Sequence, residues 1–173
     1  LLIGALRNTP YGLGRPLPHT LTKMHEEQLL QLVAGRSVSY SWREYSWLYL
    51  ELGDLTEGRL LKGDTRVNPH GDVSIFAGYS WRIERNNSIL GGSEDTTKRK
   101  CVLAKLLVGK TIESVEISSR IPELSLGFSS GLWISTFTTG RGDPDWNINF
   151  RRPDLGRLEC VNKRLVSQTL RVD

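Results

Sequence analysis

The sequence predicts an α+β fold that is β-rich overall, with two similar helix-plus-antiparallel-sheet halves packed together. Short runs rich in Val, Ile, Tyr and Trp recur between Gly, Asp and Asn residues, a pattern typical of antiparallel strands. Two helical patterns each end at a glycine, and the segments around these glycines resemble each other. With 173 residues, of which 38% are hydrophobic, the chain can bury one sizeable core or two small cores in contact.

Residues 1–21 are expected to form an N-terminal arm. Three prolines lie in this stretch, where they remove backbone donors and favour extended or turn conformations. A helix is predicted over 22–34, because a threonine can cap its start, Glu26 and Glu27 suit its first turn, and Gly35 follows its end.

Short strands are expected after this helix. Leu48 and Leu50 alternate with Tyr49 and Glu51, so one face of their strand should be core and the other exposed or in contact with a partner. The polar segments between the strands are interpreted as loops. The predicted strands cover 37–42, 47–52, 71–77 and 80–83, and the predicted loops cover 56–70 and 85–99.

The same order of elements then starts again. Thr96 and Thr97 can cap a helix whose apolar residues include Leu103 and Leu107, and Gly109 stops it. Strands are predicted over 111–118, 123–128 and 132–138. The tail over 155–172 can be a further strand or a helix, and its pattern of apolar residues does not distinguish the two.

An internal repeat explains why the elements recur. Residues 32–38 match residues 106–112 in chemical type at every position, a shift of 74 residues. Trp81 and Trp146 close the two copies and are expected in the core. The predicted organisation is the arm, a first α/β repeat over 22–95, and a second repeat with a C-terminal tail over 96–173.

No catalytic site is predicted. His19, His25 and His70 lie in the arm, in the first turn of a helix and in a loop, where surface or capping roles are expected. No zinc-binding, nucleotide-binding or hydrolase motif is present. Cys101 and Cys160 sit in no metal-binding spacing and are interpreted as buried thiols. We therefore expect no enzymatic activity, no metal and no cofactor.

Two further polar groups are interpreted as structural. The carboxylates of Glu94, Asp95, Asp143 and Asp145 lie in Gly- or Pro-containing segments, where acids usually cap helices or solvate turns. The triplet Arg141-Gly142-Asp143 resembles an integrin-binding loop, but a short exposed turn meets this pattern by chance, so no role is assigned to it.

A partner-binding surface is predicted where aromatic residues crowd into eight positions. Trp, Tyr and Arg are the residue types enriched at the energetic centres of protein interfaces. The alternative is that Trp42 and Trp47 fill the joint between the two halves. The candidate binding residues are Trp42, Arg43, Tyr45, Trp47 and Tyr49.

The charge of the chain is only mildly positive, at +4. Its cations are scattered among acids, apart from a cluster over 98–110, so nucleic-acid binding is an alternative that we do not favour. No run approaches the roughly 18 consecutive apolar residues of a membrane-spanning helix. The apolar residues 1–6 are followed by no signal-peptide cleavage site. A cytoplasmic protein with no membrane partner is expected.

The segments LVGKTIESVEI, ELSLGFSSGLWISTF and DPDWNINF, preceded by GDVSIFAGYSWRIE and ILGGSED, carry a resemblance over residues 30–150. They resemble small two-repeat α/β bacterial proteins, among them immunity proteins of polymorphic-toxin and contact-dependent inhibition systems. The resemblance implies a non-enzymatic inhibitor that binds a cognate toxin domain and occludes its active site. An inhibitor of a basic nuclease would be acidic, so the mildly basic charge favours a toxin with an acidic or neutral surface.

Overall fold

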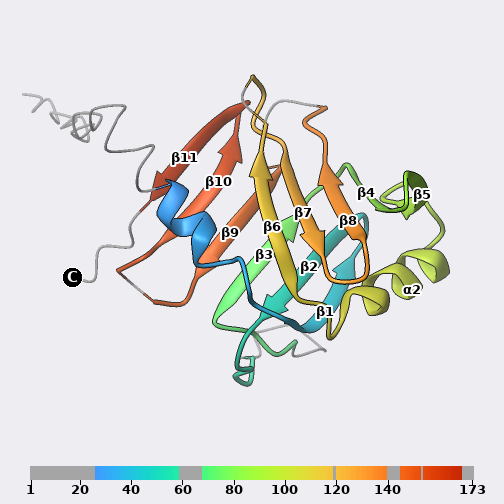
Figure 1. Cartoon of the computed structure of the whole chain (residues 1–173), viewed down its shortest axis with the longest axis horizontal. Helices are drawn as coiled ribbons and strands as arrows, with labels where there is room; N and C mark the ends of the chain where they lie inside the picture. Colours follow the sequence, from blue (N-terminus) through green and yellow to red (C-terminus); the bar gives the residue numbers. More distant parts are fainter. Residues whose placement is uncertain (1–25, 59–67, 119, 140–144, 153, 169–173) are drawn as a thin grey trace, which may run out of the picture.

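Two antiparallel sheets make up most of the protein, which confirms the predicted fold class (Figure 1). The structure is a computed structural model that describes residues 26–58, 68–118, 120–139, 145–152 and 154–168. The six-stranded sheet has the order β1 (Val38–Glu44), β2 (Trp47–Leu52), β3 (Val73–Ala77), β9 (Trp146–Phe150), β10 (Arg157–Val161), β11 (Arg164–Gln168). The five-stranded sheet has the order β5 (Ser88–Gly92), β4 (Trp81–Arg85), β8 (Leu132–Thr136), β7 (Leu124–Phe128), β6 (Ile112–Ile117).

One hydrophobic core joins the inner faces of both sheets. Alternation along each strand decides which side chains enter it, so Leu48 and Leu50 are buried in the core while Tyr49 between them is not. Trp81 and Trp146 are 2% and 0% exposed, as the sequence predicts. The helix over 26–31 and α2 (Thr97–Leu107) each add buried leucines to the same core.

The two sheets exchange strands, which the sequence did not predict. β1, β2 and β3 are continued in their sheet by β9 and β10, which come from the second half of the chain. In the other sheet, β6, β7 and β8 are continued by β4 and β5 from the first half. Neither sheet therefore belongs to one half alone, although the division of the chain into two repeats stays a prediction from sequence.

The matching segments around the two glycines lie against each other. The amide of Gly35 donates to the carbonyl of Ile112, and the amide of Gly109 donates to the carbonyl of Val38, each at 2.8 Å. Between these bonds, Ser37 and Thr111 form an antiparallel bridge, and 74 residues separate them in the chain, the same shift that relates the repeat segments. Equivalent residues of the two matching segments thus meet at this bridge.

The expectation of a loop over 85–99 is wrong in part, because β5 lies within it. Asn86 and Asn87 have φ angles of 50° and 61°, and this pair of left-handed residues forms the tight turn that joins β4 to β5. The Asn-Asn pair is a hairpin signal, and the polar composition around it concealed the strand.

The tail that the sequence left open forms a hairpin of β10 and β11. Its turn uses Asn162 and Lys163, with φ angles of 49° and 63°. The N-terminus of α2 is as predicted, because the hydroxyl of Thr96 accepts from the amide of Arg99 at 3.3 Å. The arm over 1–21, the start of the first helix and the Arg141-Gly142-Asp143 triplet lie outside the described residues. Among the helices that are described, none is long and apolar enough to cross a membrane.

Candidate functional site

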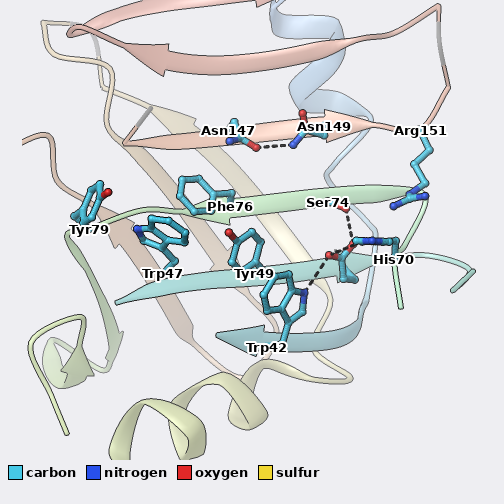
Figure 2. A pocket seen from close by; sticks show the side chains of 11 residues that line it. Trp42, Trp47, Tyr49, His70, Ser74, Phe76, Tyr79, Asn147, Asn149 and Arg151 are labelled. Carbon is cyan, nitrogen blue, oxygen red and sulfur yellow. Dashed lines mark hydrogen bonds and ion pairs between the residues drawn. The ribbon is translucent and has the colours of Figure 1, made fainter. Parts of the chain in front are cut away.

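A groove of about 520 Å³ lies on the outer face of the six-stranded sheet (Figure 2). Aromatic rings from β1, β2 and β3 line one part of it, and polar side chains from β2, β3 and β9 line the other. The residues that line the groove are Trp42, Trp47, Tyr49, Glu51, His70, Ser74, Phe76, Tyr79, Asn147, Asn149 and Arg151.

Strand register explains why these side chains meet. Directly paired residues share a face of the sheet, so Trp42, Tyr49, Phe76 and Asn147 form one row across β1, β2, β3 and β9. A second row, two residues further along β2, contains Glu51, Ser74 and Asn149. The first row is mainly aromatic and the second is polar. We call the first the aromatic row.

The rings of the aromatic row pack on one another. Trp42 and Tyr49 are stacked, with ring centroids 3.7 Å apart and planes inclined by 1°. Phe76 lies 5.1 Å from Tyr49 on the next strand. Trp47 meets Phe76 and Tyr79 edge-on, with interplanar angles of 72° and 78°. These contacts hold the rings in fixed positions, because each side chain is limited by its neighbours.

The pKa of Tyr49 is raised to about 12. Burial of the phenol is the main cause, and the negative charges of Glu44 and Glu51 add to it. The phenol therefore keeps its proton at neutral pH and can serve as a hydrogen-bond donor in the groove.

Glu51 is the structural centre of the polar row, since it is only 1% exposed although it lies on the outer face. Its Oε2 accepts from the amide of Gly71 at 2.9 Å and from the hydroxyl of Ser74 at 2.5 Å. Its Oε1 accepts from the indole N–H of Trp42 at 3.4 Å and lies 3.6 Å from Nδ1 of His70. A buried carboxylate needs such partners, and these bonds fix Trp42 and Ser74 in place.

His70 lies in the groove, so its interpretation as a surface or capping residue is incomplete. Its ring contacts Glu51, but the hydroxyl of Ser74 donates to Glu51 and not to His70. Nucleophilic catalysis of the hydrolase type requires the hydroxyl to be bonded to the histidine. The carboxylate here separates the two groups, so the three residues are arranged to support the groove and not to activate a nucleophile.

Three of the five candidate binding residues line the groove: Trp42, Trp47 and Tyr49. Tyr45 lies beside it, 77% exposed, with its ring edge-on to Trp47. Arg43 does not belong to the groove, because alternation along β1 turns it to the other face, where its Nε lies 3.2 Å from Sγ of Cys101 in α2.

The alternative in which Trp42 and Trp47 fill the joint between the halves is wrong. Leu48, Leu50 and Leu52 take the inner face of that region, and both tryptophans are on the outer face.

Sequence reasoning missed most of the polar lining. Asn147 and Asn149 alternate with the buried residues Trp146 and Ile148, so the same period-2 pattern could have placed them on the outer face. Glu51 was recognised as opposite the leucine face, but its burial was not predicted. No local signal shows that β9 lies beside β3, and this long-range pairing completes the groove.

Other candidate sites are weaker in the part of the chain that the structure describes. No group of three or more metal-ligating side chains occurs there. Within the cationic cluster, the ammonium of Lys100 donates to the carbonyl of Ser93 and the guanidinium of Arg99 donates to the carbonyl of Leu90. These two side chains each use a donor within the fold, and Lys100 is buried, so the cluster has fewer free donors for a phosphate backbone.

The groove is thus a preformed depression with an aromatic row, a hydrogen-bonded polar row and a fixed geometry, in a two-sheet protein of the α+β class. No family model, curated protein or solved structure matches the chain.

Proposed function

We propose that the protein is a non-enzymatic binding module that holds a partner protein on the groove of the six-stranded sheet. The single observation that carries the proposal is the group of partly buried rings on an outer face: Trp42, Tyr49 and Phe76 of the aromatic row, with Trp47 beside them. Large rings that the fold does not need for its core bury apolar area when a partner covers them.

The packing of the side chains within the groove also supports a binding role. Rings that already pack on one another lose little conformational entropy when a partner arrives. The polar row beside them offers directional hydrogen bonds, which give specificity more than affinity. Apolar contacts with a few placed polar groups are the usual composition of a binding site.

For the particular partner, we propose a toxin domain of a bacterial competition system, in keeping with the resemblance to immunity proteins. The protein would then act in the cytoplasm by covering the toxin. The net charge of +4 fits a toxin domain with an acidic or neutral surface.

The test is co-expression with the product of the neighbouring gene. The protein is expected to rescue growth and to co-purify with the toxin. Trp47→Ala and Tyr49→Ala are each expected to weaken the complex at least about tenfold, the size of effect found for central interface aromatics. Trp133→Ala is the matched control, because Trp133 is 37% exposed on the outer face of the other sheet.

Circular dichroism and thermal unfolding decide whether these variants remain folded. Loss of binding with unchanged unfolding supports the groove as the binding surface. If the groove variants and the Trp133 control bind equally well, the groove is not the binding surface and the proposal fails.

A further inference from the structure

The two ends of the groove differ in charge. Arg151 follows β9 at one end, where it is exposed, and its guanidinium makes no ion pair with any carboxylate in the described part of the chain. Glu44, which pairs with Trp47 across β1 and β2, lies at the opposite end and outside the lining. Asp72, whose carbonyl accepts from the amide of Arg151, has its carboxylate paired with Arg36 at 3.3 Å and lies outside the lining. The accessible charge inside the groove is therefore that of Arg151, and it is positive.

The carboxylate of Glu51 is not accessible to a partner in the groove. Glu51 accepts from Gly71, Ser74 and Trp42, and His70 lies beside it. Glu51 is also only 1% exposed, so a cation that entered the groove could not reach its oxygens.

Tyr49 lies between two other rings of the aromatic row. One of its faces is stacked on Trp42, and Phe76 lies on its other side with the ring planes inclined by 51°. An aromatic face is electron-rich and attracts cations, whereas the edge carries partial positive charge. Because Tyr49 lies between Trp42 and Phe76, a partner meets mainly the edge of its ring. That edge favours an apolar or electron-rich group over an ammonium group.

Two side-chain donors of the lining have no acceptor in the described part of the chain. The amide of Asn149 donates to Oδ1 of Asn147 at 2.6 Å, which leaves Nδ2 of Asn147 without a described acceptor. The indole nitrogen of Trp47 is buried and has no hydrogen-bond partner. Figure 2 places Asn147 and Trp47 toward the Tyr79 end and Arg151 at the far end of the same depression. Donors along the groove call for oxygen acceptors on the partner.

We infer that the groove receives an acidic segment of the partner protein. An aromatic or aliphatic side chain of that segment lies along the aromatic row, and a carboxylate beside it pairs with the guanidinium of Arg151. This inference rests on the proposed function, since it names the chemistry of the partner at the same site. The net charge of +4 favours the approach of such a partner.

Three small probes test the inference on the full chain. N-acetylphenylalanine carries a ring and a carboxylate, its amide carries the ring without the charge, and phenethylamine carries the ring with a positive charge. Binding is followed by the indole N–H resonances of Trp42 and Trp47, with those of Trp81, Trp133 and Trp146 as internal references. At low salt, the acid is expected to bind about fivefold more tightly than the amide, and the amine more weakly than both.

Substitutions test whether Arg151 causes the preference for the acid over the amide. Arg151→Gln is expected to remove the advantage of the acid over the amide and to leave the affinity of the amide unchanged. Arg120→Gln is the matched control, because Arg120 is exposed in the connection between β6 and β7 and its loss changes the net charge equally. Added salt is expected to weaken binding of the acid and to leave binding of the amide unchanged, because salt screens the pair of charges.

The outcomes separate the two proposals. If acid and amide bind equally, or the amine binds best, the acidic segment is refuted while the groove as a binding surface stands. If none of the three probes shifts Trp42 or Trp47 and the groove variants leave the toxin complex intact, both proposals fail. A toxin complex that depends on Trp47 but not on Arg151 also refutes the acidic segment alone.

Discussion

On their inner sides, the two sheets carry similar side chains at matching points of register. Leu50 pairs with Ile75 in the six-stranded sheet, and Leu126 pairs with Ile134 in the five-stranded sheet. All four side chains are 2% exposed or less. Burial in one shared core limits what these positions can hold, because a change of even one methylene group alters the packing.

The outer sides differ. The aromatic row includes Tyr49, Phe76 and Asn147. The corresponding positions of the other sheet hold Ser125, Ser135 and Arg82. Arg82 is occupied by an ion pair with Glu84 and by the ring of Phe137, 4.5 Å away. Among the described residues, the outer face of the six-stranded sheet carries the aromatic row, and the corresponding positions of the other sheet hold small or charged side chains.

The residue at the centre of the groove also has a counterpart that differs. Glu51 in β2 corresponds to Gly127 in β7, which pairs with Trp133 across the sheet as Glu51 pairs with Ser74. One position holds a buried carboxylate that organises a polar row, and the other holds no side chain. The inner faces of the two sheets therefore hold similar side chains, and the two sheets differ on their outer faces.

Trp146→Ala tests the hydrophobic core that the two sheets share. It has the largest expected effect on stability. The side chain is fully buried, and its indole N–H donates to the carbonyl of Pro122 at 2.7 Å. The expected loss of unfolding free energy is about 3–5 kcal/mol, from the cavity and the lost hydrogen bond. Urea unfolding followed by circular dichroism measures it. Trp133→Ala on the outer face is expected to cost under about 1 kcal/mol, and an equal loss in both would contradict the core assignment.

Glu51→Ala tests the feature that only the groove sheet has. Removal of the carboxylate leaves the buried amide of Gly71 and the hydroxyl of Ser74 without their acceptor. A loss of about 2–3 kcal/mol is expected, because unsatisfied buried donors pay their full desolvation cost. Urea unfolding is the measurement, with near-ultraviolet circular dichroism to report the released Trp42. Glu51→Gln keeps the shape and is expected to lose less. Unchanged stability in Glu51→Ala would show that the carboxylate does not organise the polar row.

Gly127→Ala tests the corresponding position of the other sheet. A Cβ there would lie 2.4 Å from Oγ of Ser114 and 3.0 Å from the ring of Trp133, so these side chains must shift. We expect a loss of about 1 kcal/mol in thermal or urea unfolding. In the double variant with Ser114→Ala, the loss should be smaller than the sum of the single losses, because the obstructing oxygen is gone. Strict additivity would argue against this contact.

The smallest expected effect is the loss of unfolding free energy at alkaline pH, which tests Tyr49 in the aromatic row. Burial, with Glu44 and Glu51, raises the pKa of Tyr49 from 10.0 to about 12. The unfolded chain releases this proton first, so the stabilisation is complete below about pH 10 and is lost as pH rises toward 12. Since the ring is part exposed, we expect about 1 kcal/mol or less. Unfolding free energies at about pH 9.5 and 11 measure the slope, and Tyr49→Phe should reduce it. An unchanged slope in that variant would assign the effect to other groups.

Local patterns in the sequence predict most of the strands and part of the site. Alternation around Leu48 and Leu50 identified the inner face and placed Tyr49 on the outer face, and Trp81 and Trp146 were correctly expected in the core. Composition gave a wrong prediction for β5, because polar residues surround this short strand and the segment was expected to be a loop. The aromatic residues of β1 and β2 could be proposed as a binding surface because they are close together in the chain.

The sequence by itself determined the β-rich class, the face of each strand that is buried, and the crowding of Trp42, Trp47 and Tyr49, because a period of two residues is a local property of the chain. Only the tertiary structure decided that β9 pairs with β3 and brings Asn147 and Arg151 to those rings. Strand pairing over such separations depends on which faces meet in the shared core, and no short segment contains that information.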